Sequence, residues 1–593
     1  MGIKTEREPV ATPDEHGQGL LRQAKSDWKW LALGAIFSFE FASVLLMGWP
    51  GGLIPSINLP YVFAGDALLS QWTGKRAIEG WFFENPRNGF PFGSELYDYP
   101  NSDSGSLLIY KLLGNLTHSF FSAVDLYFLL SFPVIFSVAF VVIRSFGVRK
   151  TYSAMAAVLF AFMPFHMSRL LYGHDLYTWY FSIPLFFYYG KSLFLHGKTH
   201  WGLHRPSRLL AFVLVIAALS SFGVYYAFFG VIVLMVSGIA GAARIGRIRP
   251  AVNALLVCGA IVLGLLANML PNVIYRAEHG INPEVAARVP IESEVYALKL
   301  VHLLLPQPQH RVTAMGTFTT NYNVTFPLAN TTAGLGIVGS VGFLAALLAV
   351  CAALIGRKVE PRIAMVSLVV LALLLASAVG GFNVVFAMFI SPMIRAWDRA
   401  SIFIAFGSIL TFALLLNGCS RINRSALVGT LFAMAIAVFG LLDQTPTSYA
   451  STVAIGRANA AMDQQFIQQL ESSLPPGSAI YQLPYIAFPE SAPMAQMSAY
   501  QPLTGFINSD TLRWSSGGMQ GREGDLYYRA LSKKSISDQI TAIKQLGFVG
   551  VYVDRRGFTD HGAAIVDDLT AAFGAGPTFE RADGLVVFFK IPG

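Results

Sequence analysis

Residues 61–105 read YVFAGDALLSQWTGKRAIEGWFFENPRNGFPFGSELYDYPNSDSG and form the first polar stretch after a long apolar segment. The stretch interleaves aromatic residues with six acids, namely Asp66, Glu79, Glu84, Glu95, Asp98 and Asp103. Carboxylates among aromatic rings can hold a sugar and take a proton from its hydroxyl group. A folded surface loop whose acids only face water is the alternative.

The composition predicts a polytopic α-helical membrane protein. Of the 593 residues, 54% are hydrophobic and 13% are charged, and the mean hydropathy is +0.53. Soluble domains carry about 25% charged residues, so most of this chain must face lipid or protein. The formal net charge of +8 comes from short basic clusters between apolar runs. Because Lys and Arg are retained on the cytoplasmic side of a membrane, these clusters indicate orientation rather than nucleic-acid binding.

About eleven membrane crossings are expected, since a helix needs roughly 20 mostly apolar residues to span a bilayer. The segments are 30–49, 122–143, 151–167, 176–194, two within 209–243, 251–270, 333–356, 363–379, 401–418 and 425–442. The tail 1–29 is predicted to be cytoplasmic because it carries Lys4, Arg7, Arg22, Lys25 and Lys29. The membrane domain 30–442 then has outer loops at 50–121, 271–332 and 380–400.

Residues 209–243 are predicted to cross twice, because both of their ends are basic. The break between the two short helices is expected near Ser220, Ser221 and Gly223. One long helix is the alternative, but it would place basic ends on opposite sides of the membrane. The three cysteines, Cys258, Cys351 and Cys419, all lie in or beside apolar runs, so no disulfide framework is indicated.

Residues 443–593 are predicted to form a small α/β domain. FIQQLESSL, ISDQITAIKQLG and AIVDDLTAAFG have helical patterns, whereas AIYQLP, FVGVYVD and LVVFFKI are typical of strands. An odd number of crossings places this domain outside the cytoplasm. We expect it to be a binding or lid module, with a purely structural cap as the alternative.

Asp66 is the predicted general base of the outer loop. Gly65 before it allows close backbone approach, and ALLSQWTGKRAIEGWFF after it has apolar residues at helical spacing. An amphipathic helix of this kind is expected to lie in the plane of the membrane interface. Alternatively, Asp66 caps that helix, and the two roles compete because a base needs its carboxylate unblocked.

Further residues are predicted to bind an acceptor or its sugar. Asp98 and Asp103 lie in YDYPNSDSG, a segment that is also typical of a plain turn. No cofactor motif is present, and a divalent metal at this segment is left as an alternative. His174 and Asp175 follow the third crossing, where ionisable residues are costly and mark function, although aromatic anchoring of the interface is the alternative. The indole of Trp72 completes this predicted set.

Basic residues on the outer side are predicted to bind a phosphate group. Arg395 and Arg399 flank Asp398, and a guanidinium makes paired hydrogen bonds to phosphate oxygens. An ion pair with Asp398 is the alternative. Arg169 and Lys299 are further candidates, although for Lys299 an ordinary interfacial helix with a wet charged face explains the pattern better.

This layout resembles the GT-C superfamily of polytopic membrane glycosyltransferases, on the Gly65-Asp66 pair after the first crossing, the acids of that loop and the late arginines. It is also similar to the YfhO-like bacterial membrane proteins. The GT-C resemblance implies a polyprenyl-phosphate sugar donor and a first-loop acid as base, which is Asp66 in this sequence. Many members have two adjacent acids there, whereas Ala67 follows Asp66 here, and the WWD signature of oligosaccharyltransferases is absent.

The sequence therefore predicts a glycosyltransferase of the bacterial inner membrane. Its partners are expected to be the lipid bilayer, a polyprenyl-phosphate sugar and a glycan, glycolipid or protein acceptor of the envelope, without nucleic acid. A single in-line displacement would invert the anomeric centre. Two other classes stay open, namely a transporter or flippase of a lipid-linked sugar and a non-catalytic envelope scaffold.

Overall fold

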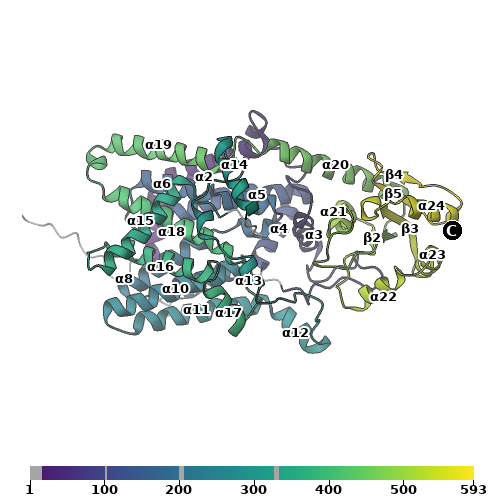
Figure 1. Ribbon diagram of the computed structural model, residues 1–593, viewed down its shortest axis with the longest axis horizontal. Coiled ribbons are helices and arrows are strands. Elements are labelled where there is room, and N and C mark those ends of the chain that lie inside the picture. Colours follow the sequence, from purple (N-terminus) through teal and green to yellow (C-terminus); the bar gives the residue numbers. More distant parts are fainter. Residues whose placement is uncertain (1–15, 101–102, 199–205, 326–332, 593) are drawn as a thin grey trace, which may run out of the picture.

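The computed structural model describes residues 16–100, 103–198, 206–325 and 333–592. The start of the predicted cytoplasmic tail, including Lys4 and Arg7, lies outside the described residues. The molecule is elongated, with a helical bundle at one end and a small α/β domain at the other (Figure 1). It is a polytopic α-helical membrane protein with a C-terminal sheet domain, as the composition and the sequence patterns predicted.

Within the described ranges, eleven helical segments correspond to the predicted crossings. They are α2 (Trp28–Met47), α5 (Phe120–Ser145), α6 (Lys150–Ala161) with α7 (Pro164–Leu171), α8 (Ser182–His196), α9 (Pro206–Ser220), α10 (Val224–Ile245), α11 (Arg249–Asn268), α15 (Gly336–Leu354), α16 (Pro361–Ser377), α18 (Ser401–Gly418) and α19 (Ala426–Gln444). Eight spans in the described chain are long and apolar enough to cross a membrane, and α9 and α16 are shorter apolar helices. The predicted break in 209–243 is confirmed, since α9 ends at Ser220 and α10 begins at Val224.

Basic residues gather at the end of the bundle opposite the α/β domain. There α1 (His16–Ser26) leads into the buried Asp27, which pairs with Arg144 Nε at 2.8 Å and Lys150 Nζ at 2.7 Å. Arg362 donates to the carbonyl oxygen of Phe146 at the same end. The basic residues that the sequence predicted to be cytoplasmic, Arg144, Lys150 and Arg362, therefore lie at one end of the bundle.

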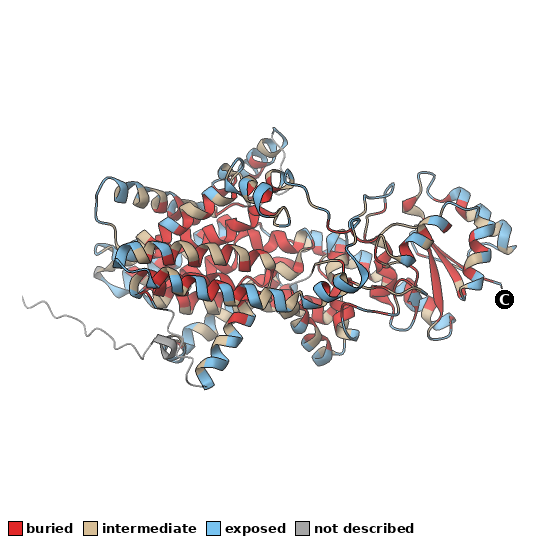
Figure 2. Cartoon of the chain, turned by 90° about the horizontal axis from the view of Figure 1, so that it is seen from below, coloured by how far each residue is buried: buried red, intermediate tan, exposed pale blue. Residues whose placement is uncertain are grey.

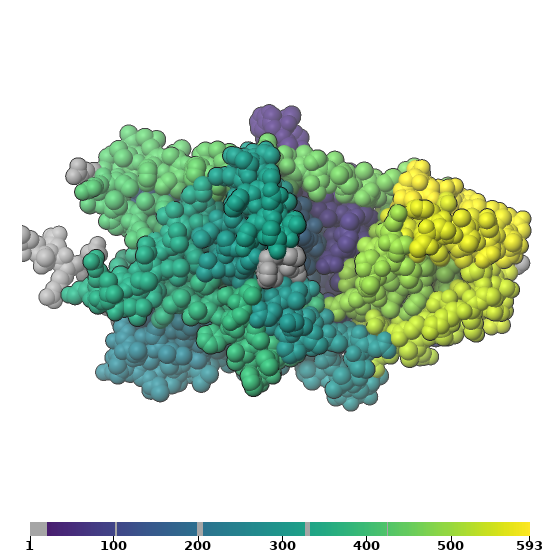
Figure 3. All heavy atoms as spheres, viewed as in Figure 1, coloured from purple at the N-terminus to yellow at the C-terminus, as the bar shows by residue number. Residues whose placement is uncertain are grey.

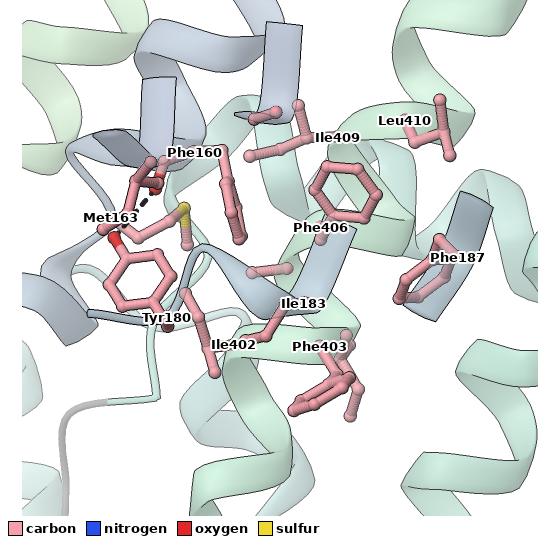
Figure 4. Packing of buried hydrophobic residues seen from close by; sticks show 14 of the residues in the cluster. Phe160, Met163, Tyr180, Ile183, Phe187, Ile402, Phe403, Phe406, Ile409 and Leu410 are labelled. Carbon is pink, nitrogen blue, oxygen red and sulfur yellow. Dashed lines mark hydrogen bonds between the residues drawn. The ribbon is translucent and has the colours of Figure 1, made fainter. Parts of the chain in front are cut away.

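The bundle core consists of close-packed aromatic and aliphatic side chains from α6, α8 and α18 (Figure 4). The ring of Phe406 lies edge-on to Phe160 at 5.0 Å and to Phe187 at 5.1 Å, and the Tyr180 hydroxyl donates to the Phe160 carbonyl at 3.1 Å. Small residues let neighbouring helices approach, because a Cβ on Gly241 of α10 would lie 2.7 Å from the Leu193 oxygen of α8. Figure 2 shows the buried residues running through the middle of the bundle.

The first outer loop folds against the α/β domain. It contains η1 (Gly51–Leu53), α3 (Asp66–Glu79) and α4 (Ser104–Thr117), and α3 lies between the bundle and the sheet (Figure 1). We expected α3 to be amphipathic and to lie in the membrane interface, but most of its residues are buried. The reason is that the α/β domain covers it: Lys75 Nζ donates to the carbonyl oxygens of Ile507 at 2.9 Å and Ser509 at 2.7 Å.

The C-terminal domain is a five-stranded sheet in the order β2-β1-β3-β5-β4. Its elements are α20 (Ala450–Ser473), β1 (Ala479–Leu483), η6 (Gln501–Leu503), α21 (Thr504–Asn508), β2 (Arg513–Trp514), α22 (Glu523–Leu531), α23 (Ile536–Gln545), β3 (Phe548–Asp554), η7 (Arg555–Gly557), α24 (Ala563–Phe573), β4 (Phe579–Glu580) and β5 (Val586–Lys590). The three predicted strands and three predicted helices are all present. Strand β1 pairs in parallel with β2 and β3, and β3 pairs antiparallel with β5. Helix α20 is longer than predicted and connects the bundle to the sheet (Figure 1).

The remaining outer segments surround the junction between bundle and sheet. The second loop contains α12 (Leu270–His279), α13 (Glu292–Val295), η3 (Leu300–Leu303) and α14 (Thr313–Thr325). The stretch 380–400 contains α17 (Phe382–Phe389) and η4 (Trp397–Ala400), and η2 (Asp175–Thr178) precedes α8. The short helix η5 (Ile422–Arg424), before α19, lies instead at the other end of the bundle, where Arg149 Nη1 donates to Asn423 Oδ1 at 3.1 Å. Phe382 is 63% exposed and Phe389 is 79% exposed, so α17 presents an apolar face to its surroundings.

Candidate active site

A cavity of about 1040 Å³ lies where the outer end of the bundle meets the first loop and the C-terminal domain. In Figure 3 the first loop (purple) is set back between the bundle and the yellow-green domain. Walls of the cavity come from the start of α3, the segment 172–177, the second outer loop, the segment 393–399 and the C-terminal segment 489–500. Residues from these and other separate parts of the sequence, among them Asp103 and Tyr225, therefore share one space.

Five of the ten predicted site residues line this cavity, namely Asp66, Asp103, His174, Arg395 and Arg399. The other five, namely Asp98, Asp175, Trp72, Arg169 and Lys299, are not among its lining residues. The fold thus brings the first-loop aspartate and the two late arginines together, although more than 300 residues separate them in the chain.

Asp66 is the first residue of α3, and Gly65 occupies the cap position before it, with φ +54°. The carboxylate of Asp66 lies 3.3 Å from His174 Nε2, and 54% of its side chain is exposed. By contrast, Asp98 and Asp175 are only 2% exposed. An exposed carboxylate on the cavity wall can be reached by a bound hydroxyl group, whereas the two buried acids cannot.

Gly173 fixes the distance between the two segments that carry Asp66 and His174. Its φ is +73°, and a Cβ at this position would lie 2.0 Å from the backbone nitrogen of Ala67. Ser70 Oγ donates to the Gly173 carbonyl at 2.7 Å and ties the same segments together. Sequence reasoning missed Gly173, and its only signal was a glycine directly before a predicted site histidine.

His174 connects Asp66 to the buried Arg169. Arg169 Nη1 lies 3.3 Å from His174 Nδ1, and a guanidinium can only donate hydrogen bonds. His174 Nδ1 must therefore be the acceptor, which leaves the proton of a neutral imidazole on Nε2, facing Asp66. Burial lowers the pKa of His174 to about 4, against the opposing effect of Asp66, so the ring is neutral at pH 7.

Arg399 is far from Asp66 in the sequence but lines the same cavity. It is buried, at 8% exposure, and its guanidinium lies 3.9 Å from the ring centre of Tyr177 and 4.2 Å from that of Tyr225. These two rings hold the guanidinium in place by cation–π attraction. Burial raises the pKa of nearby Asp103 to about 7, and the charge of Arg399 partly opposes this shift.

Arg395 lies at the rim of the cavity and is 30% exposed in its side chain. Its Nη1 donates to Glu292 Oε2 at 2.8 Å, and its guanidinium lies 5.1 Å from the ring centre of Tyr296. The sequence left an ion pair of Arg395 or Arg399 with Asp398 as the alternative, and Glu292 of the second outer loop is a partner of Arg395 that the sequence did not predict.

Asp98, Trp72 and Lys299, which lie outside the cavity, have structural partners, whereas the buried Asp175 has a carboxylate oxygen, Oδ1, without a hydrogen-bond partner among the described residues. Asp98 accepts from Arg522 Nε at 2.7 Å and Nη2 at 2.8 Å, which joins the first loop to the C-terminal domain. Trp72 is fully buried, and its Nε1 donates to Asn88 Oδ1 at 2.9 Å. Lys299 Nζ lies 4.3 Å from the ring centre of Tyr322. Burial raises the pKa of Asp175 to about 7.

A metal site is not apparent in the described part of the chain, where no group of three or more His, Cys, Asp and Glu side chains is arranged to hold an ion. In the predicted alternative, Asp98 and Asp103 would share a metal. Asp98 gives both of its oxygens to Arg522, so its carboxylate is already engaged by a bidentate cation.

Comparisons with known proteins show which fold the chain has. No family model and no curated protein matches the sequence. Among solved structures, ArnT from Cupriavidus metallidurans in the apo state shares 12% identity over 95% of this chain and 98% of that chain, with a TM-score of 0.50. The chain has a GT-C fold. The expected GT-C architecture is thereby confirmed at the level of the fold.

Two further GT-C proteins overlap this chain with lower structural scores. The archaeal oligosaccharyltransferase AglB from Archaeoglobus fulgidus, in complex with an inhibitory peptide and a dolichol-phosphate, shares 12% identity over 90% of this chain and 70% of that chain, with a TM-score of 0.46. The arabinofuranosyltransferase AftD from mycobacteria shares 13% identity over 89% of this chain, with a TM-score of 0.46. This chain spans 35% of the length of AftD.

Proposed function

We propose that this protein is an integral membrane glycosyltransferase. It moves a sugar from a polyprenyl-phosphate donor to a hydroxyl group of an envelope glycan, glycolipid or protein on the extracytoplasmic side. The observation that carries this proposal is the single cavity lined by Asp66, Arg395 and Arg399. An accessible carboxylate and two guanidiniums facing one space are what a displacement at a sugar phosphate requires.

The proposed reaction is one in-line displacement at the anomeric carbon. Asp66 takes the proton of the acceptor hydroxyl as its oxygen bonds to that carbon, while the bond from the carbon to the phosphate oxygen breaks. The sugar leaves with inverted configuration, and the lipid phosphate departs with the bonding electron pair. Arg399 and Arg395 stabilise the charge that grows on the phosphate, because guanidiniums bind phosphate oxygens in pairs.

His174 positions the base in this proposal. Its neutral ring donates Nε2–H to one oxygen of Asp66, and Arg169 holds the ring in that tautomer. A neutral donor orients the carboxylate without the loss of basicity that a full positive charge would cause. Arg169 was predicted to bind donor phosphate and His174 to bind the acceptor, so the proposal assigns both of them a different part.

The orientation in the membrane follows from the two ends of the bundle. Arg144, Lys150 and Arg362 lie at the end opposite the cavity, which favours a cytoplasmic location for that end. The exposed apolar face of α17 lies directly before Arg395 in the sequence. We propose that the lipid chain of the donor lies along this face, in the outer leaflet of a bacterial inner membrane.

Transfer of a radiolabelled sugar from a purified polyprenyl-phosphate donor tests the proposal. The protein in lipid nanodiscs should release free lipid phosphate and label the acceptor, and Asp66→Asn should remove both signals. A flippase would move labelled donor between leaflets of a vesicle with or without Asp66. A scaffold would do neither, and either of these results would refute the proposed activity.

A further inference from the structure

Glu490 reaches from the C-terminal domain to two arginines at the rim of the cavity. Its Oε1 lies 2.5 Å from Arg288 Nη2 and 3.6 Å from Arg395 Nη2. Arg288 belongs to the second outer loop and Arg395 to the segment before η4. One carboxylate oxygen is thus shared by two guanidiniums that come from different parts of the membrane domain.

All three residues face the cavity and are partly buried. The side chains of Arg288, Arg395 and Glu490 are 13%, 30% and 25% exposed, and all three line the cavity. Two arginines that converge on one oxygen form an anion site by geometry, since each guanidinium offers several hydrogen-bond donors. The oxygen that they hold in this arrangement belongs to Glu490.

The backbone of Glu490 is held in an unusual conformation. Its φ is +63°, a region that residues other than glycine rarely adopt. The Glu490 backbone N–H donates to the Tyr500 hydroxyl oxygen at 3.3 Å, which braces the segment from the cavity side. Strain of this kind is kept where the surrounding structure imposes it, and it is concentrated at ligand sites and switches.

The cluster of Arg288, Arg395, Glu292 and Glu490 has equal numbers of positive and negative charges only while Glu490 is in place. Arg395 also pairs with Glu292 Oε2 at 2.8 Å, so two arginines face two glutamates. Without Glu490, two arginines would face a single glutamate, and the site would carry one excess positive charge. The phosphate of a polyprenyl-phosphate sugar is a diester with one negative charge, so it would neutralise that excess, and its free oxygens can accept hydrogen bonds from both guanidiniums at once.

We infer that Arg288 and Arg395 form a two-arginine phosphate subsite, and that Glu490 competes with the phosphate of the donor for it. This inference rests on the proposed function, because it takes the lipid phosphate to be the incoming anion. Binding of the phosphate displaces the Glu490 carboxylate and frees the segment 489–500 of the C-terminal domain from the membrane domain. The C-terminal domain thereby sets the affinity for the donor.

The test is a binding measurement on the full-length protein in nanodiscs with undecaprenyl phosphate, the lipid phosphate that the proposed donor carries and releases. Glu490→Gln removes the competing charge and should tighten binding about three- to tenfold, the range expected for partly exposed ion pairs. Arg288→Gln should weaken binding by a similar factor. Arg288→Lys, which keeps the charge but loses the forked donors, should fall between Arg288→Gln and the wild type.

Glu284→Gln is the matched control. Glu284 lines the same cavity but pairs with Arg529 at 2.7 Å, so this change removes one negative charge without touching Arg288 or Arg395. Its affinity should stay close to that of the wild type. Equal gains for Glu284→Gln and Glu490→Gln, or unchanged or weaker binding by Glu490→Gln, would overturn the inference.

Inorganic phosphate as a competitor separates the headgroup from the lipid chain. It should displace undecaprenyl phosphate at a higher concentration, and Glu490→Gln should lower that concentration. If the variants altered the binding of inorganic phosphate but not that of undecaprenyl phosphate, the lipid donor would not use this subsite. Failure of the proposed function would look different, because sugar transfer would then not depend on Asp66 whatever the binding results.

Discussion

Asp66 and Asp98 belong to the same outer loop, yet the fold gives them opposite surroundings. Asp98 is 2% exposed, and its carboxylate is held by Arg522 through two bonds of 2.7 and 2.8 Å and by Asn282 Nδ2 at 3.1 Å. Asp66 is 54% exposed and lies 3.3 Å from a neutral histidine. Asp98 joins the first outer loop to the C-terminal domain, whereas Asp66 faces the cavity.

The comparison shows that the partner and the access of an acid decide what it can do. A carboxylate bound on both oxygens by a guanidinium is a poor base, because the positive charge stabilises its ionised form. A carboxylate oriented by a neutral N–H and open to a cavity keeps its ability to accept a proton. Asp66 therefore fits the proposed role of base, whereas Asp98 fits a structural role.

The largest effect is expected for Asp66→Asn. The side chain keeps its shape and loses its basicity, so turnover should fall by about 10²–10⁴-fold, the usual contribution of a positioned base. Because the group is half exposed, the melting temperature in detergent should stay close to that of the wild type. Sugar release measured alongside thermal unfolding checks both statements, and a variant that retains normal turnover would contradict the assignment.

Asp98→Asn should show the reverse pattern. Loss of this charge leaves Arg522 without its partner at a nearly buried site, which should cost about 2–3 kcal/mol after a discount for the partial exposure of Arg522. The melting temperature should fall, while turnover per folded molecule stays within a few-fold of normal. Asp98→Asn combined with Arg522→Gln should destabilise less than the sum of the two single changes.

The membrane part of the fold could be predicted from the sequence because its signals are local. Runs of apolar residues and the basic clusters between them gave the crossings, including the break before Val224. The strands and helices of the C-terminal domain followed from periodicity for the same reason. The start of α20 and the short strands β2 and β4 were missed, because weakly apolar helices and two-residue strands carry little pattern of their own.

The candidate site could be predicted only in part, because it depends on contacts between distant segments. Residue chemistry picked out Asp66 and Arg399, and the fold places both on one cavity. It did not predict that Asp98 pairs with Arg522, since this partner lies in the C-terminal domain. Arg288 and Glu490 were missed as well, because neither stands in a motif and only the packing of domains brings them together.

Gly173→Ala tests the comparison between Asp66 and Asp98, because it moves Asp66 without changing its side chain. The added Cβ would collide with the Ala67 nitrogen, and alanine disfavours the positive φ of this residue. We expect a loss of about 1–2 kcal/mol in stability and about a tenfold fall in turnover, because the base shifts away from the acceptor. Gly280→Ala is a matched control, since its φ is +77° and a Cβ there meets nothing within 4 Å. Equal losses of turnover in both variants would rule out a specific effect on Asp66.

The smallest effect concerns the charge state of His174, which distinguishes the environment of Asp66 from that of Asp98. Its pKa is lowered by burial to about 4, below the ordinary value near 6.5. Between these values the unfolded chain binds the proton and the folded protein does not, so His174 makes stability fall as the pH falls from about 6.5 to 4.

His174→Gln removes this contribution while keeping a donor toward Asp66. Melting curves of both proteins across that range should diverge, with the wild type losing more stability toward low pH. Asp103 and Asp175, whose pKa values are raised to about 7, act in the opposite direction in both proteins and cancel in the difference. Parallel curves would mean that the folded protein binds the proton of His174 as readily as the unfolded chain does, and Asp66 would then face a cation in this pH range much as Asp98 does.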